Sequence, residues 1–162
     1  MFNLLKDKKY DEFEKLVEAN ELIVNYLTYD NHFEPTLLIH AVEYNKDNDV
    51  VKYLSKHRVC DIRTPDHISQ TAFHLCAFND NLEAMKYLLE RDRSVLNHCT
   101  FMRSPLHYAV YQSKEMVEFL LQQEDIDVNI KEYYGRTPDC LPDVDKEIVE
   151  LIKSFRKKQK KK

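Results

Sequence analysis

Two histidines have the residue type and spacing that chemistry most often uses. His74 and His107 each lie three residues after a hydroxyl side chain, Thr71 and Ser104 respectively. An imidazole near a hydroxyl suggests nucleophilic catalysis, and an imidazole alone is a common metal ligand. The two pairs are 33 residues apart, however, and occupy the same place in a repeated phrase. A position that recurs in this way favours a structural role over a single catalytic centre.

The four cysteines do not form a metal-binding pattern. They stand at Cys60, Cys76, Cys99 and Cys140, whereas structural zinc sites draw on cysteine pairs separated by about two to four residues. The single glycine excludes a glycine-rich phosphate loop, and neither Gly-x-Ser-x-Gly nor His-Glu-x-x-His occurs. We therefore expect no catalytic residue, no metal, no cofactor and no small-molecule substrate.

A phrase of similar residues returns along the chain at a nearly constant interval. Its copies occupy residues 36–41, 71–76, 104–109 and 137–140. Each copy is followed by an apolar run with helical spacing, at residues 50–54, 85–89, 116–121 and 148–152. A fixed period of this kind predicts stacked units of two helices each.

The third copy, Ser-Pro-Leu-His-Tyr-Ala at 104–109, resembles the Thr-Pro-Leu-His-x-Ala signature of the ankyrin repeat. The interval also fits that family's unit of about 33 residues. The resemblance covers nearly the whole chain. It implies an all-α fold, an ankyrin-repeat α-solenoid of stacked helix-turn-helix units joined by short β-hairpin-like loops.

The resemblance also gives the histidines a role. In the family, this histidine joins a structural hydrogen-bond network with the nearby hydroxyl and backbone, which implies structural roles for Thr71, His74, Ser104 and His107. The first and last copies have Ile39 and Cys140 at the equivalent position. We therefore expect the network only in the middle repeats.

The expected domain organisation is one repeat domain and a short tail. The ankyrin domain spans 1–155, with a truncated N-terminal unit at about 1–30 and repeats at about 31–65, 66–98, 99–131 and 132–155. We expect the hydroxyls at 36, 71, 104 and 137 to cap backbone amides at helix starts. With so little glycine, we expect Asn and Asp to supply left-handed backbone in the turns at 45–49, 79–81 and 112–114.

The predicted tail, residues 156–162, holds six of the 24 basic residues and no acidic residue. The remaining body is acidic, which argues against broad contact with a nucleic-acid backbone. Three interpretations of the tail stay open: a solvated disordered segment, a nuclear-import signal, and a tether to an anionic membrane surface.

Cellular context follows from the ends of the chain and the cysteines. Charge appears within the first nine residues, too early for a secretory signal peptide, and no apolar stretch approaches the roughly 20 residues that span a bilayer. We expect reduced thiols and a location in the cytoplasm or nucleus.

The variable positions of the family, at hairpin tips and on the exposed face of each first helix, are the candidate partner-binding residues. Aromatic rings, Met and Arg are frequent there, and these residue types are enriched in interface hot spots. The candidates are Phe33, Tyr44, Phe78, Phe101, Met102, Arg103, Tyr111, Gln112, Tyr133, Tyr134 and Arg136. Some of these rings could instead pack against the next repeat.

One further residue, Asn129, has two interpretations. The segment Leu121-x₅-Asp127-Val128-Asn129 resembles the sequence in which ankyrin asparagines are hydroxylated by an iron-dependent asparaginyl hydroxylase. Asn129 could equally brace the turn between two repeats.

The function expected from this sequence is that of a non-enzymatic protein–protein interaction module, which binds a partner protein or peptide segment through the concave ankyrin surface. We expect the chain to be a monomer. Two alternatives remain: a regulatory ankyrin protein directed by its Lys-rich tail to the nucleus or an anionic membrane, and the ankyrin part of a larger multidomain enzyme.

Overall fold

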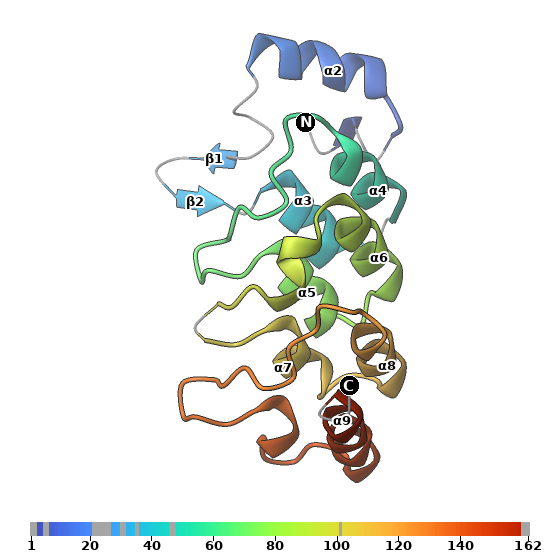
Figure 1. Cartoon of the computed structure of the whole chain (residues 1–162). Helices are drawn as coiled ribbons and strands as arrows, with labels where there is room; N and C mark the ends of the chain where they lie inside the picture. The colour runs from blue at the N-terminus through green and yellow to red at the C-terminus, as the bar shows by residue number, and fades with distance from the viewer. Residues whose placement is uncertain are drawn as a thin grey trace.

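Short helices stacked in two columns make up most of the computed structural model (Figure 1). The structure describes residues 3–4, 7–20, 27–29, 32–34, 36–45, 48–100 and 102–159. The inner column contains α3 (Leu37–His40) continued by η2 (Ala41–Asn45), then α5 (Ala72–Phe78) and α7 (Pro105–Ala109). The outer column contains α4 (Asn48–Lys56), α6 (Leu82–Arg91) and α8 (Lys114–Leu121). This arrangement confirms the stacked all-α architecture expected from the sequence.

The inner helices are buried almost all round. In α5, every residue from Ala72 to Ala77 is buried, because α5 packs against both α7 and η2. Small side chains such as Cys76, Ala77 and Ala109 allow the helices to approach closely. A helix that is apolar on all sides needs neighbours on all sides. The stack supplies those neighbours.

The outer helices are amphipathic, and each packs on the next. Buried positions recur three and four residues apart, as at Ala84, Met85 and Leu88 of α6. Side chains at the helix starts hold the first turns: Asn81 accepts from the amide of Ala84 at 3.0 Å, and Ser113 accepts from that of Met116 at 3.1 Å.

Hairpin-like loops connect the units and project on the side opposite the outer helices (Figure 1). The first contains the antiparallel strands β1 (Leu27–Tyr29) and β2 (His32–Glu34). We call the other three the second finger (residues 63–70), the third finger (98–103) and the fourth finger (130–136). Backbone hydrogen bonds close these fingers, one between Asp66 and Gln70, two between Thr100 and Arg103, and one between Glu132 and Arg136.

The expectation about left-handed turns is only partly correct. Asp80 has a φ of +55°, as expected for the turn at 79–81, but no residue of the turn at 112–114 has a positive φ. Three other left-handed residues occur at the fingertips, at Ser69 (φ +61°), Met102 (+62°) and Gly135 (+78°). These three residues are spaced by 33 positions, so the left-handed backbone conformation recurs with each finger.

The capping expectation holds most simply at Thr36, which accepts from the amide of Ile39 at 3.1 Å. The hydroxyls of Thr71 and Ser104 face the rings of His74 and His107 at 2.8 Å. At Ser104 this contact is part of a capping box, in which His107 Nδ1 accepts from the Ser104 amide at 3.2 Å. Where Ile39 replaces the histidine, the hydroxyl is left available for the backbone.

The two ends of the stack differ. At the start, α2 (Tyr10–Ala19) buries Phe13 and Val17 and packs against α4, where the carboxylate of Glu14 accepts hydrogen bonds from Tyr53 and lies 3.1 Å from His57 Nε2. At the other end, the three-residue η4 (Pro138–Cys140) precedes the long helix α9 (Lys146–Gln159).

The expected tail boundary at 156 is therefore wrong. Residues 156–159 continue α9, and Arg156 is only 23% exposed. The physical reason is an ion pair with buried Asp139, which holds the last turns of α9 against the body. Residues 160–162 lie outside the described residues.

Candidate partner-binding surface

Large exposed apolar side chains gather on the fingers and at the ends of inner helices. The exposed fractions are 54% for Phe78 and Met102, 46% for Tyr111, and 74% for both Tyr133 and Tyr134. Ile68, at 43%, lies on the second finger. Among the described residues, Leu16 on α2 is the remaining large hydrophobic side chain of this kind. Six of these seven exposed hydrophobic side chains therefore lie on the face formed by the fingers and the inner helices.

The fourth finger is a rigid platform for two tyrosines. The amide of Gly135 donates to the Glu132 carbonyl at 2.8 Å, and the left-handed Gly135 completes the turn. The rings of Tyr133 and Tyr134 meet edge to face with centroids 5.2 Å apart, and the guanidinium of Arg136 lies 5.0 Å from the Tyr134 ring centre.

A buried carboxylate holds this finger from inside. Glu132 is 2% exposed and accepts from Arg136 Nε at 2.9 Å. That hydrogen bond, helped by backbone amides of the finger, lowers the pKa of Glu132 to about 2. The carboxylate is consequently ionised throughout the physiological range.

The third finger presents Met102 at an energetic cost. A non-glycine residue with positive φ is unfavourable by about 1 kcal/mol or more. Met102 accepts this backbone conformation while 54% of its side chain faces solvent. Burial therefore does not explain the methionine at this position.

Tyr111 has a structural role through its hydroxyl group. Its hydroxyl donates to the carbonyl of Pro142 at 3.0 Å, which links the loop after α7 to the last unit. Its half-exposed ring remains available on the same face.

The two histidines are hydrogen-bonded on both ring nitrogens. His74 Nε2 lies 2.9 Å from the carbonyl of His98, so Nε2 carries the proton and Nδ1 accepts from the hydroxyl of Thr71. Burial is the main cause that lowers the pKa of His74 to about 4. His107 repeats the pattern with Ser104 and the carbonyl of Arg136, 3.3 Å from Nε2, and burial lowers its pKa as well.

Two comparisons complete the description. A family model described as ankyrin repeats (3 copies) matches residues 13–98 and again 38–132. The chain belongs to the ankyrin-repeat family. Curated proteins yielded no match to it. Ankyrin repeats generally serve as protein–protein interaction modules and are typically non-enzymatic.

In the ankyrin framework, the predicted site residues are distributed along one face. Phe78 ends α5, Tyr111 and Gln112 follow α7, and the others among the described set belong to the third and fourth fingers. Phe33 lies in β2 and Tyr44 in η2, but their side chains fall outside the description, and Phe101 lies outside the described residues altogether.

The ankyrin histidines do not form an active centre. His74 and His107 are 0% and 1% exposed, so neither ring can reach a substrate in solution. The structure brings each of them together with its hydroxyl and with the backbone of the next finger. They therefore link one ankyrin repeat to the next.

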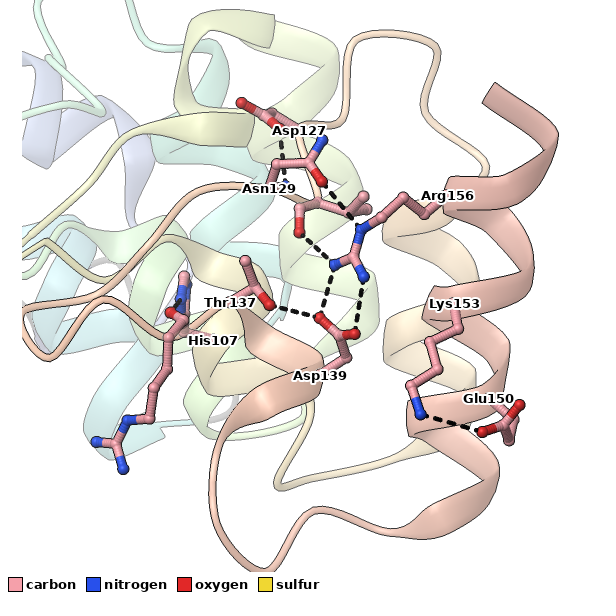
Figure 2. A network of polar contacts seen from close by, with 10 residues as sticks. His107, Asp127, Asn129, Thr137, Asp139, Glu150, Lys153 and Arg156 are labelled. Carbon is pink, nitrogen blue, oxygen red and sulfur yellow. Dashed lines mark hydrogen bonds and ion pairs between the residues drawn. The ribbon is translucent and has the colours of Figure 1, made fainter. Parts of the chain in front are cut away.

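Asn129 belongs to a polar network around Arg156 that the sequence did not reveal. Figure 2 shows Arg156 reaching from α9 toward Asn129 and Asp139. Arg156 Nε donates to Asn129 Oδ1 at 2.9 Å, and Nη2 donates to the Val128 carbonyl at 3.1 Å. Thr137 also donates to Asp139, at 2.7 Å. Hydroxylation of Asn129 stays a prediction.

The apolar spacing of α9 could have revealed Arg156. Ile148, Leu151, Ile152 and Phe155 follow the helical period, and continuing that pattern places 156 within the helix. The Lys-rich composition of residues 156–162 obscured this continuation of the helix.

Two of the four cysteines lie in the interior of the stack. Cys60 and Cys76 are buried thiols, and burial raises the pKa of Cys60 to about 12. Across the described ranges, no three His, Cys, Asp or Glu side chains come together as a metal site. Within the same ranges, every helix is too short or too polar to cross a lipid bilayer.

Proposed function

We propose that this ankyrin domain is a non-enzymatic module that binds a partner protein or peptide on the face formed by the fingers and inner helices. The observation that carries the proposal is the concentration of exposed Phe, Met and Tyr side chains on that face. Water would otherwise surround these rings, and partner contact removes them from it.

The rigidity of the face supports the same function. The second, third and fourth fingers are closed by backbone hydrogen bonds, and His74 and His107 tie the third and fourth fingers to the preceding repeat. A surface that is ordered before binding loses little conformational entropy when a partner docks. Tyr and Met side chains on such a scaffold are typical hot-spot residues.

The test is capture of partners from native lysate by the whole chain and by a Tyr111→Ala/Tyr133→Ala variant. We expect wild type to retain a partner that the variant loses, with melting temperatures within a few degrees. Tyr111→Phe isolates the loss of the hydrogen bond to Pro142, and Leu16→Ala removes an exposed apolar side chain elsewhere. Partners retained equally by all four proteins would contradict the proposal.

A second candidate function concerns the basic end of the chain. Lys157 and Lys158 are exposed on the last turn of α9 and are followed by three more lysines at 160–162. We propose cytoplasmic or nuclear residence, with these lysines directing the domain to the nucleus or to an anionic membrane. Replacing all five lysines with Gln should change the localisation of the protein; an unchanged distribution would remove this role. Arg156 must be kept, because it belongs to the fold.

A further inference from the structure

The third and fourth fingers carry positive charge on an otherwise acidic chain. The whole chain has a formal net charge of −4. These two fingers nevertheless hold Arg103, Lys131 and Arg136 against a single acidic residue, Glu132. The Glu132 carboxylate is buried and already bonded to Arg136. The charge that a partner meets on this part of the face is therefore cationic.

Arg103 has a fixed backbone and an uncommitted side chain. Its amide donates to the Thr100 carbonyl at 2.8 Å, and its carbonyl accepts from the Thr100 amide at 2.9 Å. Among the described residues, no carboxylate or carbonyl accepts a hydrogen bond from its guanidinium. A guanidinium with this freedom can bind a carboxylate through two parallel hydrogen bonds.

Arg136 is the equivalent residue of the next finger, 33 positions later. Its Nε is bonded to Glu132, and its guanidinium faces the Tyr134 ring. Within the described part of the chain, the two terminal nitrogens have no acceptor. Arg136 can therefore bind a second carboxylate beside an exposed aromatic ring.

One buried ring sets the distance between these arginines. His107 Nδ1 lies 3.2 Å from the amide of Ser104, the residue after Arg103, and His107 Nε2 lies 3.3 Å from the carbonyl of Arg136. The two arginine backbones thus flank a single imidazole and are separated by two hydrogen bonds and the width of one ring, on the order of 10 Å. An extended peptide rises about 3.3 Å per residue, so three residues cover this distance.

Exposed apolar side chains neighbour the two arginines along the chain. Met102 precedes Arg103 on the third finger, and Tyr133 and Tyr134 lie just before Arg136 on the fourth, all of them exposed. A peptide that spans both arginines therefore also crosses a methionine and two phenol rings. Both charge and apolar contact are available to the same segment.

We propose that the third and fourth fingers bind an extended peptide segment of the partner in which two Asp or Glu residues, about three positions apart, are separated by apolar residues. The carboxylates pair with Arg103 and Arg136, and the apolar residues pack on Met102, Tyr133 and Tyr134. This inference rests on the proposed function and names the chemistry of the segment that is recognised.

The experiment is selection of a random dodecapeptide library, displayed on phage, against the full chain. We expect the selected peptides to be enriched in Asp or Glu at positions i and i+3 with apolar residues between them. Synthetic copies of the best sequence should bind Arg103→Glu at least about tenfold more weakly than wild type, since close charge pairs dominate such contacts. A copy with its first acidic residue changed to Lys should regain affinity for Arg103→Glu.

The matched control is Arg93→Glu. Arg93 lies in the short helix η3 (Arg93–Asn97), just before the third finger in the chain, and its exposed side chain forms an ion pair with Asp125. This variant changes the net charge by the same amount and should bind the peptide like wild type. Equal weakening in both variants would show only a general charge effect and would overturn the pairing with Arg103.

The remaining outcomes separate this inference from the function on which it rests. Selected peptides that lack the acidic pattern, but lose affinity in Tyr133→Ala, would overturn the acidic segment and leave the partner-binding function intact. A library that yields no binder would overturn the inference, while capture of a folded partner from lysate would still support the function. Circular dichroism of each variant confirms that it is folded.

Discussion

Arg156 and Asp139, 17 residues apart, form a two-point ion pair: Nη2 lies 2.6 Å from Oδ1, and Nη1 lies 2.8 Å from Oδ2. The Asp139 side chain is 1% exposed. Burial alone would raise the pKa of this carboxyl, but hydrogen bonds from Arg156 and Thr137 outweigh it, and the pKa is lowered. The pair fastens the last helix to the fourth repeat (Figure 2).

Replacing Arg156 should therefore destabilise the fold. We expect Arg156→Ala to lower the free energy of unfolding by about 2 to 3 kcal/mol, because it leaves a buried carboxylate unpaired. Urea denaturation at neutral pH measures the change. Lys153→Ala is the matched control, since it removes an exposed pair with Glu150 at 3.3 Å and should cost less than about 1 kcal/mol. Similar losses in both variants would contradict the structural role of Arg156.

Truncated chains should show that the folded domain extends beyond Phe155 and includes Arg156. A chain that ends at Gln159 keeps Arg156 and should unfold at the same urea concentration as the full chain. A chain that ends at Phe155 loses the ion pair and should be destabilised at least as much as Arg156→Ala. Equal stability of the two truncated chains would place the end of the folded domain before 156.

Asn129 supplies only one of the acceptors around Arg156. We expect Asn129→Ala to cost no more than about 1 kcal/mol, because the Asp139 and Val128 contacts remain. Modification is measured separately, as intact mass after incubation with an asparaginyl hydroxylase. One added oxygen in wild type and none in Asn129→Ala would establish the site; an unchanged wild-type mass would remove it.

Acidification should destabilise the domain through His74. Its pKa is about 4 in the folded protein against 6.5 for the ordinary group, so the unfolded chain binds the proton first. The contribution of neutral His74 is complete above about pH 6.5 and falls as the pH drops toward 4, by up to about 3 kcal/mol. Urea denaturation at pH 7.5 and pH 5 tests this. His74→Gln should be less stable at pH 7.5 and should lose less stability on acidification; parallel pH curves for both proteins would refute the assignment.

Replacing Met102 with glycine should stabilise the protein and weaken its binding to a partner. Met102→Gly relieves the positive φ and should raise the free energy of unfolding by about 0.5 to 1 kcal/mol, while weakening partner affinity. Ser69→Gly relieves the same backbone conformation on the second finger and should stabilise the protein without affecting a peptide bound to the third and fourth fingers. Thermal melts and peptide titrations of both variants measure the two effects. Unchanged affinity in Met102→Gly would exclude its side chain from the interface.

Much of the fold was predictable because ankyrin-like repeats are held by contacts between neighbouring units. Each unit repeats the same apolar positions, so the period in the sequence reports the period in space. The exposed positions of Phe78, Tyr133 and Tyr134 could be anticipated from this register. The side-chain environments of Phe33 and Tyr44 lie outside the described residues.

Several features could not be predicted from local patterns. The Lys-rich composition after Phe155 suggested a tail, whereas Arg156 is held by a carboxylate 17 residues earlier. The hydroxyls of Thr71 and Ser104 were expected on backbone amides, but a histidine one turn later offers them a better acceptor. In both cases, the partner is decided by which groups packing brings within hydrogen-bond distance.

By itself, the sequence determined the repeat period, the alternation of inner and outer helices and the face on which aromatic rings collect, because each of these depends on residues close together in the chain. Only the tertiary structure decided that Arg156 pairs with Asp139, that Ser69 and Met102 adopt left-handed backbone, and that Arg103 and Arg136 flank one buried histidine. These relationships depend on hydrogen bonds between neighbouring units, and such bonds form only when the stack places their donors and acceptors side by side.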